Sequence, residues 1–210
     1  MRLRKKPWIP EAIKQYEDLV AEAFPGGNWP ELFGRTAPLH VELGMGRGRF
    51  LCEMAARSPQ INFVGIEGQL DVLYYAAQKM AERELTNVKL LHFDVNGIVD
   101  IFRPGEVSRL YINFCDPWPK NRHAKRRLTH RRFLDKYRRI LTSGGELFFK
   151  TDNAELFQFS LDEFADCELK LQNISFDLHN SDYTGNIMTE YEERFSKKGM
   201  KIYRCEVIFG

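Results

Sequence analysis

The sequence predicts an α/β fold, doubly wound, with a mostly parallel seven-stranded Rossmann-like sheet that carries helices on both faces and an antiparallel C-terminal strand. Two observations support this prediction. Between residues 39 and 150, short apolar runs typical of buried strands alternate with longer segments whose apolar residues recur at helical spacing. A glycine-rich turn, Gly44-Met-Gly46-Arg-Gly48, joins the first run to the first helical segment, where doubly wound proteins bind ligands.

Residues 1–36 are expected to form an extension that packs on a domain spanning residues 37–210. The extension opens with a basic cluster and continues with an amphipathic helix from residue 10 to residue 24, ended by Pro25-Gly26-Gly27. The basic cluster consists of Arg2, Arg4, Lys5 and Lys6, and the apolar side of the helix of Ile13, Tyr16, Leu19, Val20 and Phe24.

The domain itself begins with alternating strands and helices. We expect strands at residues 39–43, 63–67, 88–93, 110–115 and 146–150, and helices at 49–57, 69–83, 129–141 and 154–164. Beyond these, residues 169–178 and 200–209 read as two strands joined by a polar loop and a short helix. An antiparallel pair at one edge would complete the sheet.

Composition restricts the class of protein. The chain has 210 residues, 43% of them hydrophobic, which is enough for the core of one domain. No run approaches the ~20 apolar residues that span a bilayer, and the start lacks the features of a signal peptide, so we expect a cytoplasmic protein without membrane contact. The four cysteines, Cys52, Cys115, Cys167 and Cys205, have no paired spacing, and the five histidines are dispersed, so no metal or disulfide is expected.

Positive charge is concentrated in one segment. Residues 120–139 contain ten Lys or Arg and one acid, a balance of +9, whereas the other 190 residues hold 21 basic and 28 acidic residues, a balance of −7. The helical half of this segment could be a solvated face. The loop half, residues 120–127, repels itself unless a polyanion is bound, and we therefore predict phosphate contacts there.

Glycines and acids mark a ligand site at the ends of the strands. The turn reads G-x-G-x-G, and Arg49 stands where a dinucleotide fingerprint has Gly or Ala, which disfavours a nicotinamide-dependent oxidoreductase. Glu67 ends the second strand, where a carboxylate can accept hydrogen bonds from two ribose hydroxyls. The acids Glu42, Glu67, Asp94 and Asp116 belong to four successive strands and should converge on one crevice.

Asp116 opens a stiff loop. Pro117 and Pro119 fix their own φ angles and restrict the residues before them. Trp118 between them could stack on an extruded base or pack as a hydrophobic plug under the loop. Cys115 is expected to be a buried thiol rather than a nucleophile, and His123 to be solvated.

The segments E-L-G-M-G-R-G from Glu42, N-F-C-D-P-W-P-K-N-R-H-A-K-R-R from Asn113, F-K-T-D-N from Phe149 and N-I-M-T-E-Y-E-E-R-F from Asn186 resemble the bacterial tRNA (guanine-N7)-methyltransferase family. The likeness covers nearly the whole chain. It implies a class I S-adenosylmethionine-dependent methyltransferase domain at residues 37–210, transferring a methyl group to N7 of guanine 46 in the variable loop of tRNA. Cys115, where a serine is common, and Gly68-Gln69 after Glu67 are small departures.

The resemblance also implies roles for particular residues. Asp116 would be the catalytic residue, with its carboxylate beside the methyl donor. S-adenosylmethionine would be held by Glu42, Gly44, Gly46, Gly48, Glu67, Asp94 and Asp116; the substrate by Lys120, Asp152, Thr189, Glu190, Tyr191 and Glu192; and the RNA by Arg122, His123, Ala124, Lys125, Arg126 and Arg127. Whether the protein is a monomer or a homodimer stays open.

The chemistry agrees with this reading, because guanine N7 carries a free lone pair and needs no general base. A carboxylate on the Watson–Crick edge would recognise guanine and stabilise the cation that forms. Asp152 or Glu192 could take that position. Asp152 could instead cap the next helix. Thr189 to Glu192 match a capping box, in which the Glu192 side chain would already be occupied, so Asp152 is ranked slightly ahead of Glu192 as the residue that recognises guanine.

Two other classes of function remain as alternatives. A catalytically silent RNA-binding protein is disfavoured, because four acids in one empty cleft repel each other. A methyltransferase acting on a small molecule or a protein would not require the cationic segment.

Overall fold

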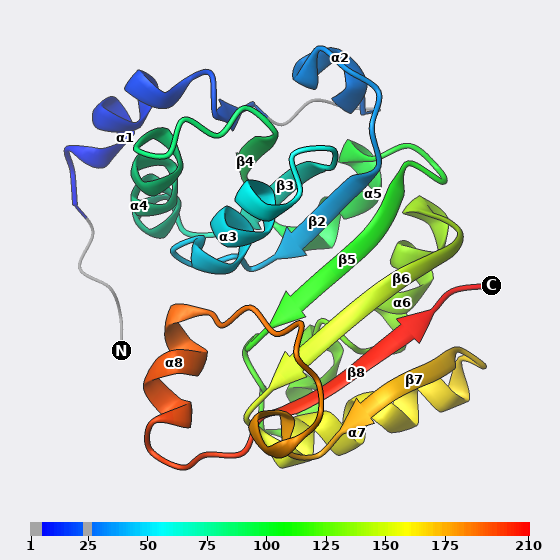
Figure 1. Cartoon of the computed structure of the whole chain (residues 1–210). Coiled ribbons are helices and arrows are strands. Elements are labelled where there is room, and N and C mark those ends of the chain that lie inside the picture. Colours follow the sequence, from blue (N-terminus) through cyan, green and yellow to red (C-terminus); the bar gives the residue numbers. More distant parts are fainter. Residues whose placement is uncertain (1–5, 23–26) are drawn as a thin grey trace.

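The computed structural model describes residues 6–22 and 27–210. Its centre is one eight-stranded sheet with the order β1-β4-β3-β2-β5-β6-β8-β7 (Figure 1). Neighbouring strands run parallel from β1 to β6, and β8 is antiparallel to both β6 and β7. The strands are β1 (Val20–Ala21), β2 (Leu39–Leu43), β3 (Asn62–Glu67), β4 (Val88–His92), β5 (Val107–Asn113), β6 (Leu141–Thr151), β7 (Lys170–Ser175) and β8 (Tyr203–Ile208).

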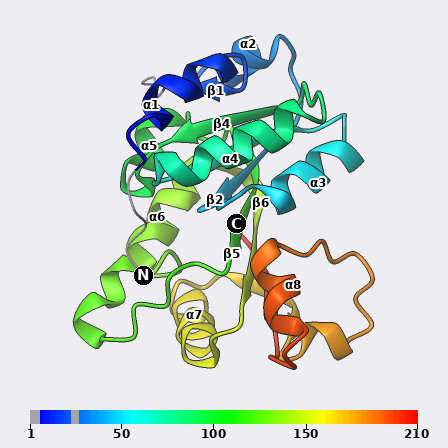
Figure 2. The same ribbon diagram turned by 90° about the vertical axis from the view of Figure 1, so that its left-hand side faces the viewer.

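Helices cover both faces of the sheet, as predicted. The α-helices are α1 (Ile9–Ala12), α2 (Trp29–Phe33), α3 (Arg49–Arg57), α4 (Leu70–Ala81), α5 (Ile98–Ile101), α6 (Arg131–Ile140), α7 (Ala154–Asp166) and α8 (Glu190–Ser196). Short 3-10 helices are η1 (Ile13–Tyr16), η2 (Val95–Gly97), η3 (Asn121–Arg126) and η4 (Leu178–Asn180). Figure 2 shows α6 and α7 on one side of the sheet and α3 and α8 on the other.

Alternation along β2 decides which side chains reach which face. Val41 and Leu43 pack into the large core beneath α5, α6 and α7, whereas a second core lies under α3 and α4 around Leu51, Phe63 and Leu73. Glu42 therefore points to the face that carries α3. None of the helices in the described residues is long and apolar enough to cross a membrane.

The predicted N-terminal helix is wrong over its second half. The chain forms only α1 and η1, then turns into the two-residue strand β1, which pairs with Leu90 and Leu91 of β4 and adds an eighth strand to the predicted seven. The apolar side chains named for the helix still contact the second core, because Ile13, Tyr16, Leu19 and Val20 pack against it. Phe24 lies outside the described residues.

The other predicted elements lie where the sequence places them, with shifted ends, and the short helices α2 and α5 were not predicted. β5 stops two residues before Cys115 because Phe114 has a φ of +54°, which is incompatible with a continuing strand. β6 begins earlier, at Leu141, directly after α6. The C-terminal strands form the predicted antiparallel pair, and α8 is the short helix between them.

Candidate active site

The glycine-rich turn between β2 and α3 has an open and a packed part. Gly44, Gly46 and Gly48 all have positive φ, at +73°, +58° and +73°. A Cβ on Gly48 would lie 2.9 Å from side-chain atoms of Ala76 and Met80, so this glycine lets α4 approach. Among the described residues, apart from the adjoining ones in the chain, no heavy atom lies within 4 Å of a Cβ placed on Gly44 or Gly46. The turn thus offers bare backbone to a ligand at these two positions.

Glu42, on β2, is buried beside this turn. Its side chain is 1% exposed, and Asn113 donates a hydrogen bond of 2.8 Å to Oε1. Among the described residues, Oε2 has no hydrogen-bond partner. Burial raises the pKa of Glu42 to about 8, against the smaller opposing effects of Asn113 and Lys150. A ligand with a cationic or donor group would satisfy the free oxygen.

Glu67, at the end of β3, organises the turn. Its Oε2 accepts a hydrogen bond from the Gly46 amide and its Oε1 one from the Gln69 amide, both at 3.0 Å. Burial raises the pKa of this carboxyl although these amide donors lower it. Each oxygen keeps a second lone pair, so these bonds leave room for the predicted ribose contact.

Asp94 lines a cleft of about 730 Å³, which we call the Asp94 cleft. Its Oδ1 accepts hydrogen bonds from the Asn96 amide and side chain at 2.9 and 2.8 Å, which caps η2. The cleft is also lined by Gly44, Ile66, Gly68, His92, Phe93, Val95, Asn96, Trp118, Arg126, Leu128, Arg132 and Phe133. A second cleft of about 240 Å³, the Glu42 cleft, shares Gly44 with it. Its other lining residues are Met45, Gly46, Arg47, Asn113, Phe114, Thr189, Glu190 and Tyr191.

Asp116 is exposed on the loop after β5. In sequence it stands between Phe114, which lines the Glu42 cleft, and Trp118, which lines the Asp94 cleft. Three of the four predicted acids therefore sit at the strand ends around the turn, and the fourth is carried by the loop that passes from one cleft to the other. Cys115 is half-buried, and burial raises the pKa of its thiol to about 12, so it behaves as a structural thiol.

Arg127 has an internal position that the sequence did not reveal. It is 8% exposed, donates hydrogen bonds of 3.0 and 3.1 Å to the carbonyls of Pro117 and Trp118, and lies over the ring of Phe159 at 4.3 Å. Trp118 has a φ of +42°, an unfavourable conformation for a bulky residue. The Arg127 guanidinium thus holds the strained part of the Asp116 loop.

Trp118 forms part of the wall of the Asp94 cleft, so it is neither a fully buried plug nor a ring within the Glu42 cleft. The guanidinium of Arg126 lies 4.9 Å over its ring, and His123 approaches it edge-on at 5.8 Å. The predicted cationic loop folds as η3. Its side chains at Lys120, Arg122, Lys125 and Arg126 are exposed, and those at His123 and Ala124 are half-buried.

The segment before and within α8 borders the Glu42 cleft. Thr189 caps the helix by accepting a hydrogen bond of 2.9 Å from the Glu192 amide, which is one half of the predicted capping box; the Glu192 carboxylate bonds to Lys150 and Asn186 instead. The Tyr191 hydroxyl donates to Asp152 Oδ2 at 2.9 Å. Asn153, not Asp152, caps α7, since its Oδ1 accepts from the Leu156 amide at 2.7 Å. Tyr191 engages Oδ2 of Asp152, and because this side chain is only half-buried its Oδ1 can be reached by another donor.

Glu192 is fully buried and occupied. Its Oε2 accepts from Lys150 Nζ at 2.7 Å, and Asn186 donates to its Oε1 at 2.6 Å. Lys150 Nζ also donates to Asn186 and to the Ile187 carbonyl. These contacts favour Asp152 over Glu192 as the residue open to a substrate. Lys150 was missed by sequence reasoning, because nothing marks a strand lysine as buried.

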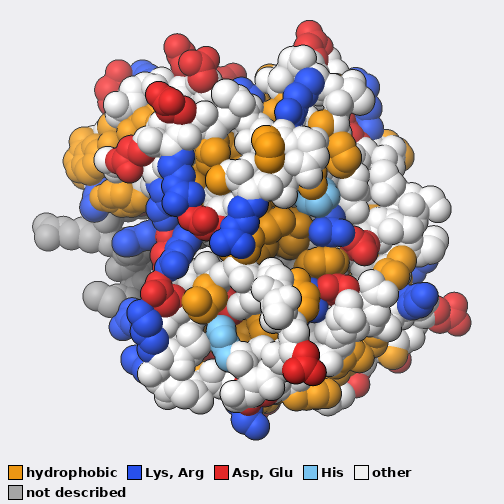
Figure 3. Space-filling model, viewed as in Figure 1, with side chains coloured by type: hydrophobic (Ala, Val, Ile, Leu, Met, Phe, Trp, Pro, Cys, Tyr) orange, Lys and Arg blue, Asp and Glu red, His pale blue; other side chains and the backbone are white. Residues whose placement is uncertain are grey.

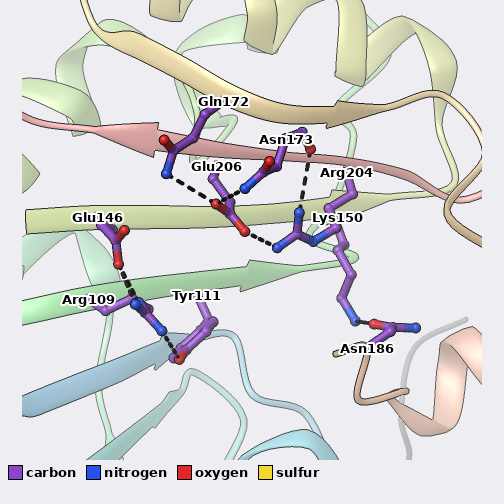
Figure 4. A network of polar contacts seen from close by, with 9 residues as sticks. All are labelled: Arg109, Tyr111, Glu146, Lys150, Gln172, Asn173, Asn186, Arg204 and Glu206. Carbon is purple, nitrogen blue, oxygen red and sulfur yellow. Dashed lines mark hydrogen bonds and ion pairs between the residues drawn. The ribbon is translucent and has the colours of Figure 1, made fainter. Parts of the chain in front are cut away.

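A polar network continues under this segment (Figure 4). Arg109 bonds to Glu146 and lies 3.4 Å from the Tyr111 hydroxyl, and Arg204 pairs with Glu206, which also accepts from Asn173 at 2.6 Å. On the other side of α8, Glu190 pairs with Lys79 of α4 and Glu193 with Arg49 of α3. The segment is therefore held to both halves of the sheet.

Three comparisons place the chain among known proteins. A family model described as "Putative methyltransferase" matches residues 36–205. The tRNA (guanine-N(7)-)-methyltransferase of Halalkalibacterium halodurans is 56% identical over 100% of this chain and 96% of its own length. The enzyme of that name from a Geobacillus species is 50% identical over 99% and 95%.

Solved structures show the same fold at low identity. A crystal structure of the 16S rRNA methyltransferase KamB aligns with a TM-score of 0.66 at 11% identity, covering 87% of this chain and 92% of that one. Geranyl diphosphate C-methyltransferase from Streptomyces coelicolor, solved with S-adenosyl-L-homocysteine, aligns at 0.55 and 16% identity over 95% and 74%. With a family model that matches most of its length and relatives at least half identical from end to end, the chain belongs to the tRNA (guanine-N7-)-methyltransferase family.

Proposed function

We propose that this chain transfers the methyl group of S-adenosylmethionine to N7 of the variable-loop guanine, guanine 46, of tRNA in the cytoplasm. The observation that carries the proposal is the pair of clefts that meet at Gly44, one bordered by the exposed basic loop and the other by the Thr189 to Tyr191 segment. Residues 37–210 would form the methyltransferase domain, and residues 1–36 an extension packed on it.

The site fits the methyl donor. Bare backbone at Gly44 and Gly46 gives room for it, Asp94 and Glu67 can accept from its nucleoside hydroxyls, and the orphaned Glu42 Oε2 can accept from its amino group. When bound, the donor supplies a sulfonium methyl group to a nucleophile in line with it. Asp116 stands on the loop between the clefts, where a carboxylate stabilises positive charge during transfer.

Guanine would enter the Glu42 cleft between Phe114 and the Thr189 to Tyr191 segment. Asp152, held by Tyr191, would accept hydrogen bonds from the guanine N1–H and amino group. Both donors strengthen as the ring becomes cationic, so this contact stabilises the transition state more than the ground state. Lys120 would contact guanine O6 or a phosphate. Thr189 and Glu192 would act by fixing α8.

The exposed cations of the basic loop, Arg122, Lys125 and Arg126, would bind the RNA backbone, with His123 and Ala124 in the same turn. Arg127 would support the loop that carries Asp116 and would not contact the RNA. The chain would act on tRNA as a monomer or a homodimer.

The test is to incubate the purified protein with labelled S-adenosylmethionine and an unmodified tRNA transcript, then to cleave the RNA by chemistry selective for 7-methylguanosine. We expect cleavage at the variable-loop guanine only. A transcript with adenine at that position is the matched control. Asp152→Asn should lower the rate at least tenfold with little change in tRNA affinity. Label in RNA without such cleavage would contradict the N7 target, and no label at all would contradict RNA methylation.

A further inference from the structure

A third depression extends the Glu42 cleft along α4. It encloses about 320 Å³ and is lined by Arg47, Tyr75, Gln78, Lys79, Glu82 and Glu190; we call it the Tyr75 groove. Arg47 and Glu190 line both this groove and the Glu42 cleft. Since the Glu42 cleft meets the Asp94 cleft at Gly44, the three depressions follow one another across the molecule.

Two cations at this groove are held on an aromatic ring instead of on an acid. Lys6 Nζ donates to the Tyr75 hydroxyl and lies 4.8 Å from the centre of its ring, and the Arg47 guanidinium lies 5.6 Å from the same ring. Within residues 6–22 and 27–210, neither cation forms an ion pair with a carboxylate. Cations on an aromatic face keep their charge available to an incoming anion.

The other charges of the groove are accounted for. Lys79 pairs with Glu190 and donates to the Arg47 carbonyl at 3.0 Å, so these two side chains cancel. Glu82 is exposed and is the other acid, beside Glu190, among the described residues that line the groove. Figure 3 shows Lys and Arg side chains gathered at the left of this face, where α4 and α8 approach each other.

The position of this groove relative to the basic loop suggests its partner. Arg126 of the loop lines the Asp94 cleft at one end of the series, and Arg47 and Tyr75 line the groove at the other end. A nucleotide that enters the Glu42 cleft is part of a chain and has a phosphate on each side. One flank can run toward the basic loop, and the other then leaves toward the groove.

We infer that Lys6, Arg47 and Tyr75 form a second RNA contact, which binds the backbone of the nucleotides that flank the target guanine on the side away from the basic loop. The inference rests on the proposed function for the identity of the RNA. The two cations neutralise phosphates, and Tyr75 holds them in place. A protein partner is disfavoured because five of the six described residues that line the groove are polar or charged, and Tyr75 is the sixth.

The experiment measures the affinity of unmodified tRNA transcript at several KCl concentrations. The double variant Lys6→Gln/Arg47→Gln is compared with Arg57→Gln/Lys170→Gln, which removes two exposed cations outside the three depressions and gives the same change in net charge. Glu82→Gln removes the opposing acid from the groove. S-adenosylhomocysteine affinity and thermal unfolding check that each variant folds.

We expect the double variant to bind tRNA roughly tenfold more weakly, with a slope of log affinity against log salt smaller by about two, one for each phosphate contact. Arg57→Gln/Lys170→Gln should match the wild type, and Glu82→Gln should bind more tightly. If Arg47→Gln also alters S-adenosylhomocysteine affinity, the single variant Lys6→Gln tests the inference. Its slope of log tRNA affinity against log salt should be smaller than that of the wild type by about one.

Equal affinity and salt slope in the Lys6→Gln/Arg47→Gln and Arg57→Gln/Lys170→Gln variants would overturn the inference, while wild-type methylation of the variable-loop guanine would leave the proposed function standing. A wild-type protein that binds no tRNA would overturn both. Weaker binding by the Lys6→Gln/Arg47→Gln variant without any methylation by the wild type would retain the surface and remove the assigned reaction.

Discussion

Two neighbouring arginines show how far position outweighs residue type. Arg126 is exposed and lies over Trp118, whereas Arg127 is buried and donates to the carbonyls of Pro117 and Trp118. Both belong to the same cationic run, and the sequence assigned both to RNA. In the structure one faces solvent and the other supports the loop that carries Asp116.

The prediction at this position separates affinity from turnover. Arg127→Ala removes two hydrogen bonds from a charged donor, so we expect the free energy of unfolding to fall by about 2 kcal/mol or more and kcat to fall, with tRNA affinity nearly unchanged. Arg126→Ala should weaken tRNA binding and leave stability within about 0.5 kcal/mol of the wild type. Urea denaturation, steady-state kinetics and tRNA titration decide. Equal effects of the two changes on tRNA affinity would contradict the internal role of Arg127.

Glu42 should make stability fall as pH rises. Its ordinary pKa of 4.5 is raised to about 8 in the folded protein, so between these values the folded chain keeps a proton that the unfolded chain has lost. The favourable contribution is complete below pH 4.5 and is lost as pH rises toward 8, by up to about 1.4 kcal/mol per pH unit. Glu42→Gln keeps a neutral side chain at every pH. Between pH 5 and pH 8, the free energy of unfolding of the variant should therefore rise relative to that of the wild type. If the two free energies change with pH in the same way, the pKa of Glu42 is not raised.

At the scale of elements, α8 is held in place mainly by charges. The buried pair Lys150 and Glu192 joins β6 to α8, and the outer pairs with Lys79 and Arg49 join α8 to α4 and α3. Exposed pairs contribute little, whereas a buried charge left alone is costly. The position of the Thr189 to Tyr191 segment therefore depends chiefly on Lys150.

Breaking that pair should destabilise the protein more than removing it entirely. Lys150→Met removes the ammonium group from buried Glu192 and leaves it the Asn186 amide and the His179 ring, 3.2 Å from its Oε1, so we expect a loss of about 3 to 5 kcal/mol in the free energy of unfolding. Adding Glu192→Gln should recover part of the loss, because the uncompensated charge is gone. Urea denaturation of both singles and the double variant gives the coupling, and hydrogen exchange in residues 186–196 reports the segment. Strict additivity would show that the pair does not interact.

The same elements show what the sequence could predict. From β2 to α7 the order and type of the strands and longer helices follow from apolar periodicity, whereas the four-residue helix α5 does not. The glycine turn with its acids locates the clefts. The N-terminal extension failed because Ile13, Tyr16, Leu19 and Val20 do face the core, yet a 3-10 turn and a strand present them as well as a helix would. Here the apolar spacing predicts which side chains are buried, but it does not predict the secondary structure that carries them.

At the scale of the whole molecule, the cations proposed to bind RNA are separated from the cleft proposed to bind the methyl donor. The basic loop and the Tyr75 groove lie at opposite ends of the clefts, while Glu42, at the centre, is buried. Buried Arg127, Lys150 and Glu192 could not be distinguished from exposed residues by sequence, because burial of a charge depends on partners from distant segments. The convergence of Glu42, Glu67 and Asp94 could be predicted from the sequence, because the carboxyl ends of parallel strands lie at one edge of the sheet.

This division predicts different salt responses for the two ligands. Raising KCl from 50 to 200 mM should weaken tRNA binding by at least about tenfold, because phosphate contacts release counterions. The affinity of S-adenosylhomocysteine should change less than about twofold, since the contacts we propose for it lie in a partly enclosed cleft that screening reaches poorly. Titrations of both ligands across the same salt series provide the measurement. A cofactor affinity that falls in step with that of tRNA would contradict the separation.

The two-residue strand β1 has a consequence for how separate molecules meet. Paired with Leu90 and Leu91, it covers part of the edge of β4, which would otherwise form one border of the sheet. The opposite border, β7, is irregular between Gln172 and Ser175, with Asn173 at a φ of +52°. Within the residues that the structure describes, neither border offers a long, straight row of free amides and carbonyls, so a strand from a neighbouring chain finds little to extend. The N-terminal segment thus protects the protein from edge-to-edge aggregation as well as carrying Lys6 to the Tyr75 groove.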